Sequence, residues 1–328
     1  MKRRYSKTLR GEVRAELRKL THGIIMWLIV CAVFGGFYIA DGYFGWNLLP
    51  HRAVADTASA RVVDTEGAVV AVHFLDVGQG DSELIVTPDK TMLIDSGEEQ
   101  YADEVTAFLK AQSIHKLDYI IATHPHSDHM GGMSRIIADF PPAVMILPKV
   151  QDSVVPTTSV YERMLTAVAA SGCEVVAAVP GYTVDMGHGA SVKLLAPVRD
   201  YDDLNSYSVV AKLTFGSDSF LFTGDIEQEA EHDIVKATPS SDLRTDVLKI
   251  AHHGSKTSST QEFLTAVAPR YAVIEVGAGN SYGHPAPDTL TLLKTINAAI
   301  LRTDELGNIT FLCDGNGGYK IRHSRAAA

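Results

Sequence analysis

The sequence predicts a mixed α/β domain in which two β-sheets pack face to face with helices outside. Three observations support this fold class. Short runs rich in β-branched residues alternate with amphipathic stretches of helical period. This succession occurs twice along the chain, and several apolar runs end in polar residues suited to chemistry. With 46% apolar residues among 328, the chain can bury one sizeable core, which we expect over residues 68–323.

Each expected element follows from the period of its apolar residues. The first set comprises strands at residues 68–77, 83–87, 91–95 and 118–123, and a helix over 102–112. The second set comprises a strand at 144–148, a helix over 160–171, strands at 191–197, 208–215 and 219–225, a helix from 227, and strands at 247–252 and 271–277. A helix over 289–298 and strands at 309–313 and 318–321 close the domain.

The N-terminal residues are expected to tether the domain to a membrane. Residues 23–40 form an uncharged apolar run of 18 residues, just long enough to cross a hydrocarbon core as a helix. Lys and Arg crowd the preceding residues, which places the N-terminus in the cytosol. We expect a basic cytoplasmic tail at 1–20, a transmembrane anchor at 21–45, a linker at 46–67, an extracytoplasmic domain and a tail at 324–328. A cleaved signal peptide, processed near Ala58-Ser59-Ala60, is the alternative, and it also exports the domain.

The most informative segment lies where an expected strand ends in four potential metal ligands. Residues 120–132 read IIATHPHSDHMGG, which supplies His124, His126, Asp128 and His129. A tight loop can direct the first two ligands to one cation and the next two to a second, with bonds of about 2.0–2.2 Å to zinc. Two cations about 3.5–4 Å apart share a hydroxide that acts as nucleophile. The pattern therefore predicts a two-metal hydrolase.

Further ligands are expected at the ends of two later strands. Asp225 closes the run FTGD and presents a carboxylate beside a glycine, as suits a bridge between two cations. The run KIAHHGS places His252 and His253 after another apolar strand. One histidine of this pair is expected to bind metal.

Six segments, in the same order, resemble the metallo-β-lactamase superfamily. They are residues 74–82 (FLDVGQGDS), 93–97 (LIDSG), 123–132 (THPHSDHMGG), 223–225 (TGD), 251–255 (AHHGS) and 280–285 (NSYGHP). The resemblance covers about residues 69–323 and is closer to the hydrolase domain of the competence protein ComEC and to cell-surface choline-phosphate esterases. It implies an αββα sandwich with two divalent metal ions between the sheet edges, zinc being expected and manganese the alternative.

The same resemblance implies a role for each polar residue of these segments. It places His124, His126 and Asp225 around the first ion. It places Asp128, His129, Asp225 and His253 around the second ion, with His252 beside the substrate. His284, in the run YGHP, is expected to act as a proton donor or a phosphate ligand. The residues expected to act in catalysis are Asp128, Asn205, His252 and His284.

One feature departs from many members of that superfamily. They carry a further histidine ligand before the bridging aspartate, in the region where residues 205–208 read NSYS. His188 lies too far upstream and between two glycines, which is typical of a surface turn. Asn205 is expected to contact the substrate or a metal-bound water, and zinc versus manganese stays open.

Other polar residues give weaker indications. Asp95 is expected either to orient a ligand imidazole or to form a turn before Ser-Gly. Asp76 and Asp81 flank a Gly-Gln-Gly turn. We expect them to stabilise this turn at least as much as we expect them to face a metal. Cys173 and Cys313 either pair or stay thiols. The histidines expected to be ordinary polar residues are His22, His51, His73, His115, His232 and His323.

The expected reaction is hydrolysis of a phosphoester or phosphodiester by a metal-bound hydroxide. A lactam or lactone hydrolase is the alternative on the same fold, and a noncatalytic binding module ranks last. The chain has a net charge of −10, and its first 20 residues carry an excess of basic groups, so the exported part is strongly acidic. Binding of nucleic-acid phosphates depends on basic side chains. Lys249, Lys256 and Arg270 are the candidates for a local basic patch that would bind them. A small phosphoester, single-stranded DNA or a surface polymer headgroup is the expected substrate, and no protein partner is indicated.

Overall fold

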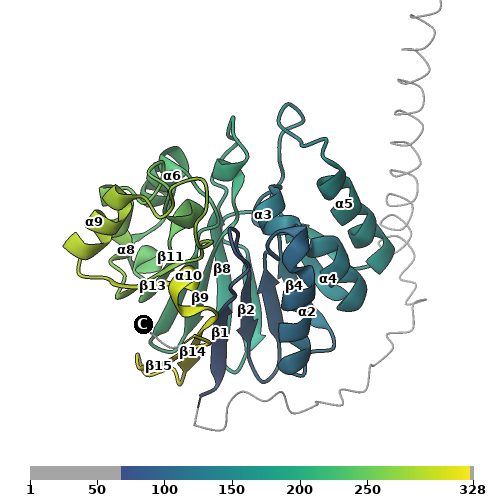
Figure 1. Ribbon diagram of the computed structural model, residues 1–328, viewed down its shortest axis with the longest axis horizontal. Coiled ribbons are helices and arrows are strands. Elements are labelled where there is room, and N and C mark those ends of the chain that lie inside the picture. Colours follow the sequence, from purple (N-terminus) through teal and green to yellow (C-terminus); the bar gives the residue numbers. More distant parts are fainter. Residues whose placement is uncertain (1–67, 326–328) are drawn as a thin grey trace, which may run out of the picture. The chain divides into compact units, whose positions relative to one another are not determined.

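Residues 68–325 are described by the computed structural model of the chain, and their strands form two sheets that pack face to face (Figure 1). The expected cytoplasmic tail, transmembrane anchor and linker lie outside the described residues. Between residues 68 and 325, no helix combines the length and the apolar character that crossing a membrane requires.

The first sheet has the strand order β15-β14-β1-β2-β3-β4-β5-β6. Its strands are β1 (Val70–Phe74), β2 (Glu83–Val86), β3 (Thr91–Ile94), β4 (Leu117–Ile121), β5 (Pro142–Leu147), β6 (Glu174–Ala177), β14 (Ile309–Cys313) and β15 (Tyr319–His323). Strands β3 to β6 run parallel, so their carboxyl ends share one edge. β14, from the C-terminal part of the chain, pairs antiparallel with β1.

The second sheet has the order β13-β12-β11-β10-β9-β8-β7. Its strands are β7 (Thr183–Gly187), β8 (Ala190–Ala196), β9 (Val210–Phe215), β10 (Asp218–Phe222), β11 (Val247–Lys249), β12 (Tyr271–Ile274) and β13 (Ala299–Arg302). Strands β10 to β13 are parallel, whereas β7 to β10 form antiparallel neighbours. In each sheet, the carboxyl ends of the parallel strands therefore lie along one edge, where polar loops can gather.

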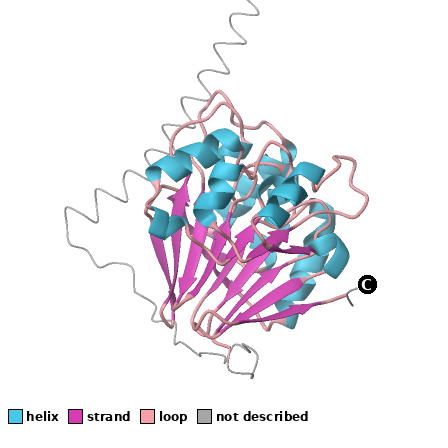
Figure 2. Ribbon diagram, turned by 90° about the vertical axis from the view of Figure 1, so that its left-hand side faces the viewer, coloured by secondary structure: helices cyan, strands magenta, loops and turns pink. Residues whose placement is uncertain are grey.

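Helices lie on the outer faces of both sheets (Figure 1, Figure 2). Those of the first half are α2 (Ala102–Ala111), α3 (Ser127–Met130), α4 (Met133–Asp139) and α5 (Ser159–Ser171). Those of the second half are α6 (Gln228–Ala237), α7 (Ser240–Leu243), α8 (Gln261–Val267), α9 (Pro287–Thr295) and α10 (Thr303–Leu306). Short 3-10 turns are η1 (Glu99–Tyr101), η2 (Asn205–Tyr207) and η3 (Ala251–Gly254).

Three apolar cores hold these layers together. Between the sheets, the ring of Phe74 lies 5.9 Å from the rings of both Phe222 and Phe311, and all three side chains are fully buried. The other two cores lie between each sheet and its helices. Because both faces of β1 are covered, every residue of this strand is buried. Its apolar run is therefore nearly continuous rather than alternating.

The structure confirms the predicted pair of sheets and each predicted strand and helix, with shifted ends. Several predicted strands end earlier than expected, because the chain turns there to present polar residues. The predictions missed the strands β6, β7 and β13 and the short helices α3, α4, α7, α8 and α10. β6 is an edge strand whose residues are largely exposed, so it lacks the apolar pattern of a strand. Cys173, just before β6, and Cys313, at the end of β14, are free thiols.

Candidate metal centre

The candidate site lies where the carboxyl ends of the parallel strands of the two sheets meet. Loops after β3, β4, β10 and β11 supply its polar side chains, as is general for the carboxyl ends of parallel strands. Those side chains are Asp95, His124, His126, Asp128, His129, Asp225, His252 and His253. The backbone N–H of Val209 donates to the carbonyl of Thr123 at 2.9 Å and links the two sheets at this point. The backbone N–H of His252 donates to the carbonyl of Gly224 at 3.1 Å and joins two neighbouring loops.

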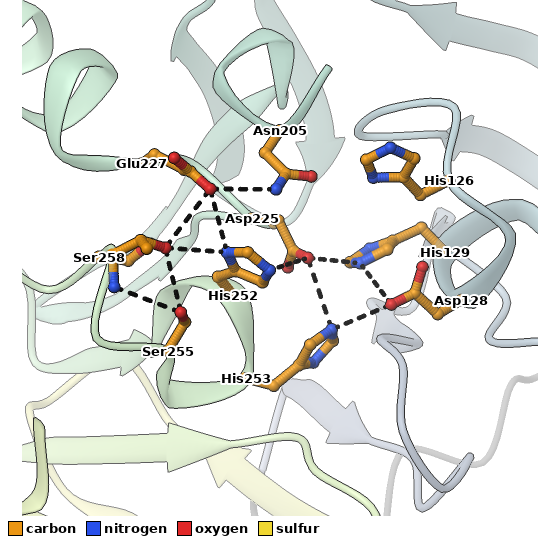
Figure 3. A network of polar contacts seen from close by, with 12 residues as sticks. His126, Asp128, His129, Asn205, Asp225, Glu227, His252, His253, Ser255 and Ser258 are labelled. Atoms are coloured by element: carbon orange, nitrogen blue, oxygen red, sulfur yellow. Dashed lines mark hydrogen bonds and ion pairs between the residues drawn. The ribbon is translucent and has the colours of Figure 1, made fainter. Parts of the chain in front are cut away.

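Four of these residues converge on one point (Figure 3). Asp225 Oδ2 lies 3.2 Å from His129 Nε2 and 3.5 Å from His253 Nε2. Asp128 Oδ2 lies 3.3 Å from His253 Nε2 and 3.9 Å from His129 Nε2. Ligand atoms about 2.0–2.2 Å from a tetrahedral cation lie roughly 3.4 Å from one another. The four distances given above are close to this spacing, so the cluster could hold a single cation, and its members are the set expected for the second ion.

A buried carboxylate orients His129 from behind. Asp95 Oδ2 lies 2.7 Å from His129 Nδ1, so the opposite ring nitrogen faces the cluster. Asp95 is fixed in turn by Thr123, whose backbone N–H and hydroxyl donate to its two oxygens at 2.8 and 2.6 Å. Such an outer carboxylate sets the tautomer and direction of a ligand imidazole. Of the two roles considered for Asp95, this geometry supports the orienting one.

Turn η3 directs both His252 and His253 toward the cluster. His252 and His253 have φ angles of 53° and 54°, in the left-handed region that residues other than glycine rarely adopt. Each such residue costs on the order of 1–3 kcal/mol and is found mostly at functional sites. His253 is held by its Nδ1 atom, 2.9 Å from the carbonyl oxygen of Glu275. His253 thus joins the four-residue cluster, while His252 lies beside it with Nε2 3.8 Å from Asp225.

His124 and His126 form a second pair of candidate ligands next to the cluster. His124 Nε2 lies 2.9 Å from His126 Nδ1, so both nitrogens face the same point. The other nitrogen of His124 lies 3.1 Å from the hydroxyl of Thr123 and 3.2 Å from that of Ser208. Burial, aided by neighbouring His129, holds the pKa of His124 well below its ordinary value. His124 is therefore neutral, as a metal ligand must be.

A fully buried lysine lies behind the cluster. Lys249 Nζ is 2.7 Å from Asp81 Oδ2, and both side chains are inaccessible to solvent. Asp81 Oδ1 is 3.2 Å from His253 Nδ1, so the ion pair supports a candidate ligand. Two further buried carboxyl groups, Glu83 and Glu275, flank this pair. Burial and the charge of Asp81 raise the pKa of Glu275 to about 8, which keeps this group protonated at neutral pH.

The electrostatics of the cluster favour cation binding. Burial alone would lower the pKa of His253, but Asp225 and Asp81 outweigh it and raise the pKa to about 10. The pKa of His129 is likewise held well above its ordinary value by Asp225 and Asp128 despite burial. Protons thus compensate the carboxylates in the metal-free protein. Within residues 68–325, Asp225 Oδ1 is buried without a hydrogen-bond partner, as expected for an atom that binds a cation.

The cluster opens into a polar cavity of about 260 Å³. Its walls are formed by Gln79, His126, Ser127, Asp128, Asn205, Asp225, His252, His253, Tyr282 and His284. The rings of His252 and His284 lie 5.7 Å apart, and Tyr282 stacks on His284 at the same distance. Bound cations at the base of this cavity would act as Lewis acids on a substrate that enters it. All the residues expected to act in catalysis therefore line one space.

Two expectations from the sequence need correction. Lys249 cannot belong to a basic surface patch, because its side chain is fully buried. Arg270 precedes β12 and so lies at the opposite end of that strand from the site, which leaves Lys256 as the exposed basic residue near it. Asp81 belongs to the group of buried charged residues behind the cluster, which also contains Lys249, Glu83 and Glu275 and which we call the supporting layer. Asp76 instead pairs with Arg325. A charged residue inside the apolar run of β11 was the available signal for Lys249.

The remaining histidines stay outside the cluster, as expected. His188 is in the turn between β7 and β8 and pairs with Asp89 at 2.6 Å. His73 is buried, and burial lowers its pKa to about 4. The exposed histidines are His115, His232 and His323. His22 and His51 lie outside the described residues.

Comparison with known proteins agrees with this geometry. A sequence model described as "Metallo-beta-lactamase superfamily" matches residues 75–277. ComE operon protein 3 of Bacillus subtilis is 30% identical over 258 residues, which cover 73% of this chain and 32% of that protein. Competence protein ComA of Neisseria gonorrhoeae is 29% identical over 292 residues, which cover 85% of this chain and 37% of that protein. The chain thus spans about a third of the length of these curated relatives.

Among solved structures, the fold is similar to CmlA, a diiron beta-hydroxylase from Streptomyces venezuelae. The TM-score is 0.50 at 15% identity, over 75% of this chain and 54% of CmlA. At this sequence identity the similarity supports the fold alone and gives no information on the reaction.

Replacing the buried lysine tests the supporting layer. We expect Lys249→Met to lower the free energy of unfolding by about 3–5 kcal/mol, because Asp81 would lose its buried partner. Metal affinity should fall about tenfold, as when other outer supports of ligands are removed. Urea unfolding of the metal-free protein and competition with a chelator measure the two effects. The exposed Lys256→Met is the control and should change stability by less than about 0.5 kcal/mol; equal effects of both variants would contradict the assignment.

The protonated histidines predict opposite pH dependences with and without metal. His253 binds a proton more tightly in the folded state, with a pKa of about 10 against 6.5. In the metal-free protein its stabilisation is therefore complete below about pH 6.5 and is lost as the pH rises through about 10. Metal ligation requires the deprotonated imidazole, so the zinc-loaded protein should instead gain stability as the pH rises. Thermal unfolding from pH 6.5 to 9.5, with chelator or zinc, measures this; parallel profiles would refute it.

Proposed function

Because the chain belongs to the metallo-beta-lactamase superfamily of metal-dependent hydrolases, we propose that it hydrolyses phosphodiester bonds at the site between its two sheets. The observation that carries the proposal is a four-ligand cluster that opens into a cavity lined by further imidazoles. Two bound divalent cations would polarise the phosphoryl group and water and neutralise the leaving oxygen. We assign Asp128, His129, Asp225 and His253 to one ion, and His124, His126 and Asp225 to the other.

Asp128 and His284 have complementary roles in this proposal. Burial alone would raise the pKa of Asp128, but His129 and the bond to His253 hold it below its ordinary value. Asp128 is therefore ionised, faces the cavity and can accept a proton from the attacking water. Burial and the nearby His253 lower the pKa of His284 to about 4, so this side chain is neutral at pH 7. Of the two roles considered for His284, the neutral ring supports a hydrogen bond to a phosphoryl oxygen rather than proton donation.

Charge around the cavity supports a single phosphodiester group rather than a long duplex as the substrate. Among the described residues, no Lys or Arg lines the cavity. An adjoining hollow is lined by Asp203, Glu227 and Glu229, with Lys256 as its basic residue. Duplex binding relies on rows of basic side chains. Recognition here would instead rest on the cations, which suits a strand end or a small phosphodiester.

Among phosphodiesters we propose single-stranded DNA as the substrate, because the names of the relatives refer to competence and recombination. These relatives carry the names ComE operon protein 3 and competence protein ComA, and a third relative, from Haemophilus influenzae, is named recombination protein 2. We propose that the domain degrades a DNA strand at the outer surface of a membrane to which residues 21–45 anchor it. A surface polymer headgroup is a second phosphodiester of suitable size.

Hydrolysis of a generic phosphodiester tests the proposal. Metal-loaded protein should cleave bis-(p-nitrophenyl) phosphate and single-stranded DNA, with manganese or zinc, and leave nitrocefin and a homoserine lactone intact. Asp225→Ala removes a ligand common to both ions and should lower metal content and activity together, by at least about 100-fold for activity. Release of p-nitrophenolate and elemental analysis of the same sample measure both. Cleavage of nitrocefin without phosphodiester turnover would overturn the proposal.

The role of His284 is separable from metal binding. His284→Ala should retain the full metal content, because this side chain lies outside the four-ligand cluster. Its kcat should fall by roughly 100-fold, as when a hydrogen bond to the transition state is removed. Steady-state kinetics and metal analysis test this together. Loss of metal from His284→Ala would make this residue a ligand instead.

A further inference from the structure

The first of the two cation positions has an incomplete set of protein ligands. His124 Nε2 and His126 Nδ1 are 2.9 Å apart and face one point. Among residues 68–325, however, no group of three His, Cys, Asp or Glu side chains with converging ligand atoms includes either of them. The region where a further histidine was expected instead supplies Asn205 from η2 and Ser208 just after it. Ser208 cannot fill the gap, because its hydroxyl lies 3.2 Å from the rear nitrogen of His124 and accepts the backbone N–H of Asp225.

The amide of Asn205 is oriented with its oxygen toward His126. Asn205 Nδ2 donates to Glu227 Oε1 at 3.3 Å, and an ionised carboxylate accepts only from the nitrogen side of an amide. The same Glu227 oxygen is 3.4 Å from the hydroxyl of Thr257 and 3.6 Å from His252 Nδ1, so its position is fixed from the other side. In Figure 3 the oxygen of Asn205 accordingly lies on the side of His126.

This amide oxygen is a buried acceptor without a partner. Within the described part of the chain, Asn205 Oδ1 is shielded from solvent and makes no hydrogen bond. Leaving such an acceptor unpaired costs about 1–3 kcal/mol. Both Asn205 and His126 line the same cavity. A cation between them would satisfy the amide oxygen and the two ring nitrogens at once.

We propose that Asn205 Oδ1 is the third neutral ligand of the first cation, in the place of an imidazole. The position then has two nitrogen ligands and one amide oxygen, together with the carboxylate of Asp225. Oxygen ligands suit manganese and magnesium better than an imidazole does, whereas zinc favours nitrogen. The first position should consequently bind more weakly than the second and should prefer manganese. The inference concerns metal binding and holds whichever substrate the domain cleaves.

Metal titrations of Asn205 variants test this proposal without any substrate. The wild-type protein should bind two equivalents of manganese, one tightly and one weakly. Asn205→Ala should lose the weak equivalent, with its Kd rising by at least about tenfold. Asn205→Asp keeps an oxygen and adds charge, so it should retain both equivalents. Asn205→His should raise the zinc affinity of the weak position above that of the wild type, because an imidazole replaces the amide.

Two further observations keep the test decisive. Asn316→Ala, at an exposed turn, is the matched control and should bind as the wild type does. Circular dichroism and thermal unfolding show whether each variant is folded, and Asn205→His gives a gain of affinity that misfolding cannot imitate. Two manganese equivalents with unchanged Kd in Asn205→Ala would overturn the proposal. Absence of phosphodiester turnover in a protein that follows the expected titrations would refute only the proposed function.

Discussion

Buried carboxylates at the junction of the two sheets constrain the rest of the site. Asp81, Asp95 and Asp225 are all essentially inaccessible to solvent, and each would cost several kcal/mol if its charge had no partner. Lys249 compensates Asp81, and His129 lies between Asp95 and Asp225. The remaining negative charge is compensated by protons on His129 and His253, or by cations. Metal binding thus exchanges one form of compensation for another without requiring a different arrangement of side chains.

Support of the candidate ligands extends through two layers of residues. Asp95 and Thr123 fix His129 from the first sheet, while His253 is fixed by Asp81 from the loop between β1 and β2 and by Glu275 just after β12 of the second sheet. The strained backbone of His252 and His253 is tolerated because these contacts define it from several directions. A ligand set assembled in this way is held in place before a cation arrives, which limits the reorganisation that binding requires.

The sequence supplied the fold class and the cluster, but only part of their support. Apolar runs that end in His124, Asp225 or His252 predicted both strands and site, because parallel strands in a covered sheet leave a clear pattern. The histidine run alone contains four ligands, so local spacing was sufficient to find it. Lys249 was assigned to the surface and Glu275 escaped notice, because their roles depend on contacts between strands far apart in the chain. Edge strands such as β6 escaped because an exposed strand has no apolar period to detect.

The pairing of β14 with β1 bears on when the site can form. Val70 pairs with Cys313, so the first sheet joins segments from the two ends of the domain. Contacts of such large separation make folding slow, because the entropy of closing a long loop must be met before the contact forms. The domain cannot close this sheet until nearly all of it has been synthesised. Cation capture then belongs to the compartment in which the finished chain folds, and the metals available there decide which one the site first meets.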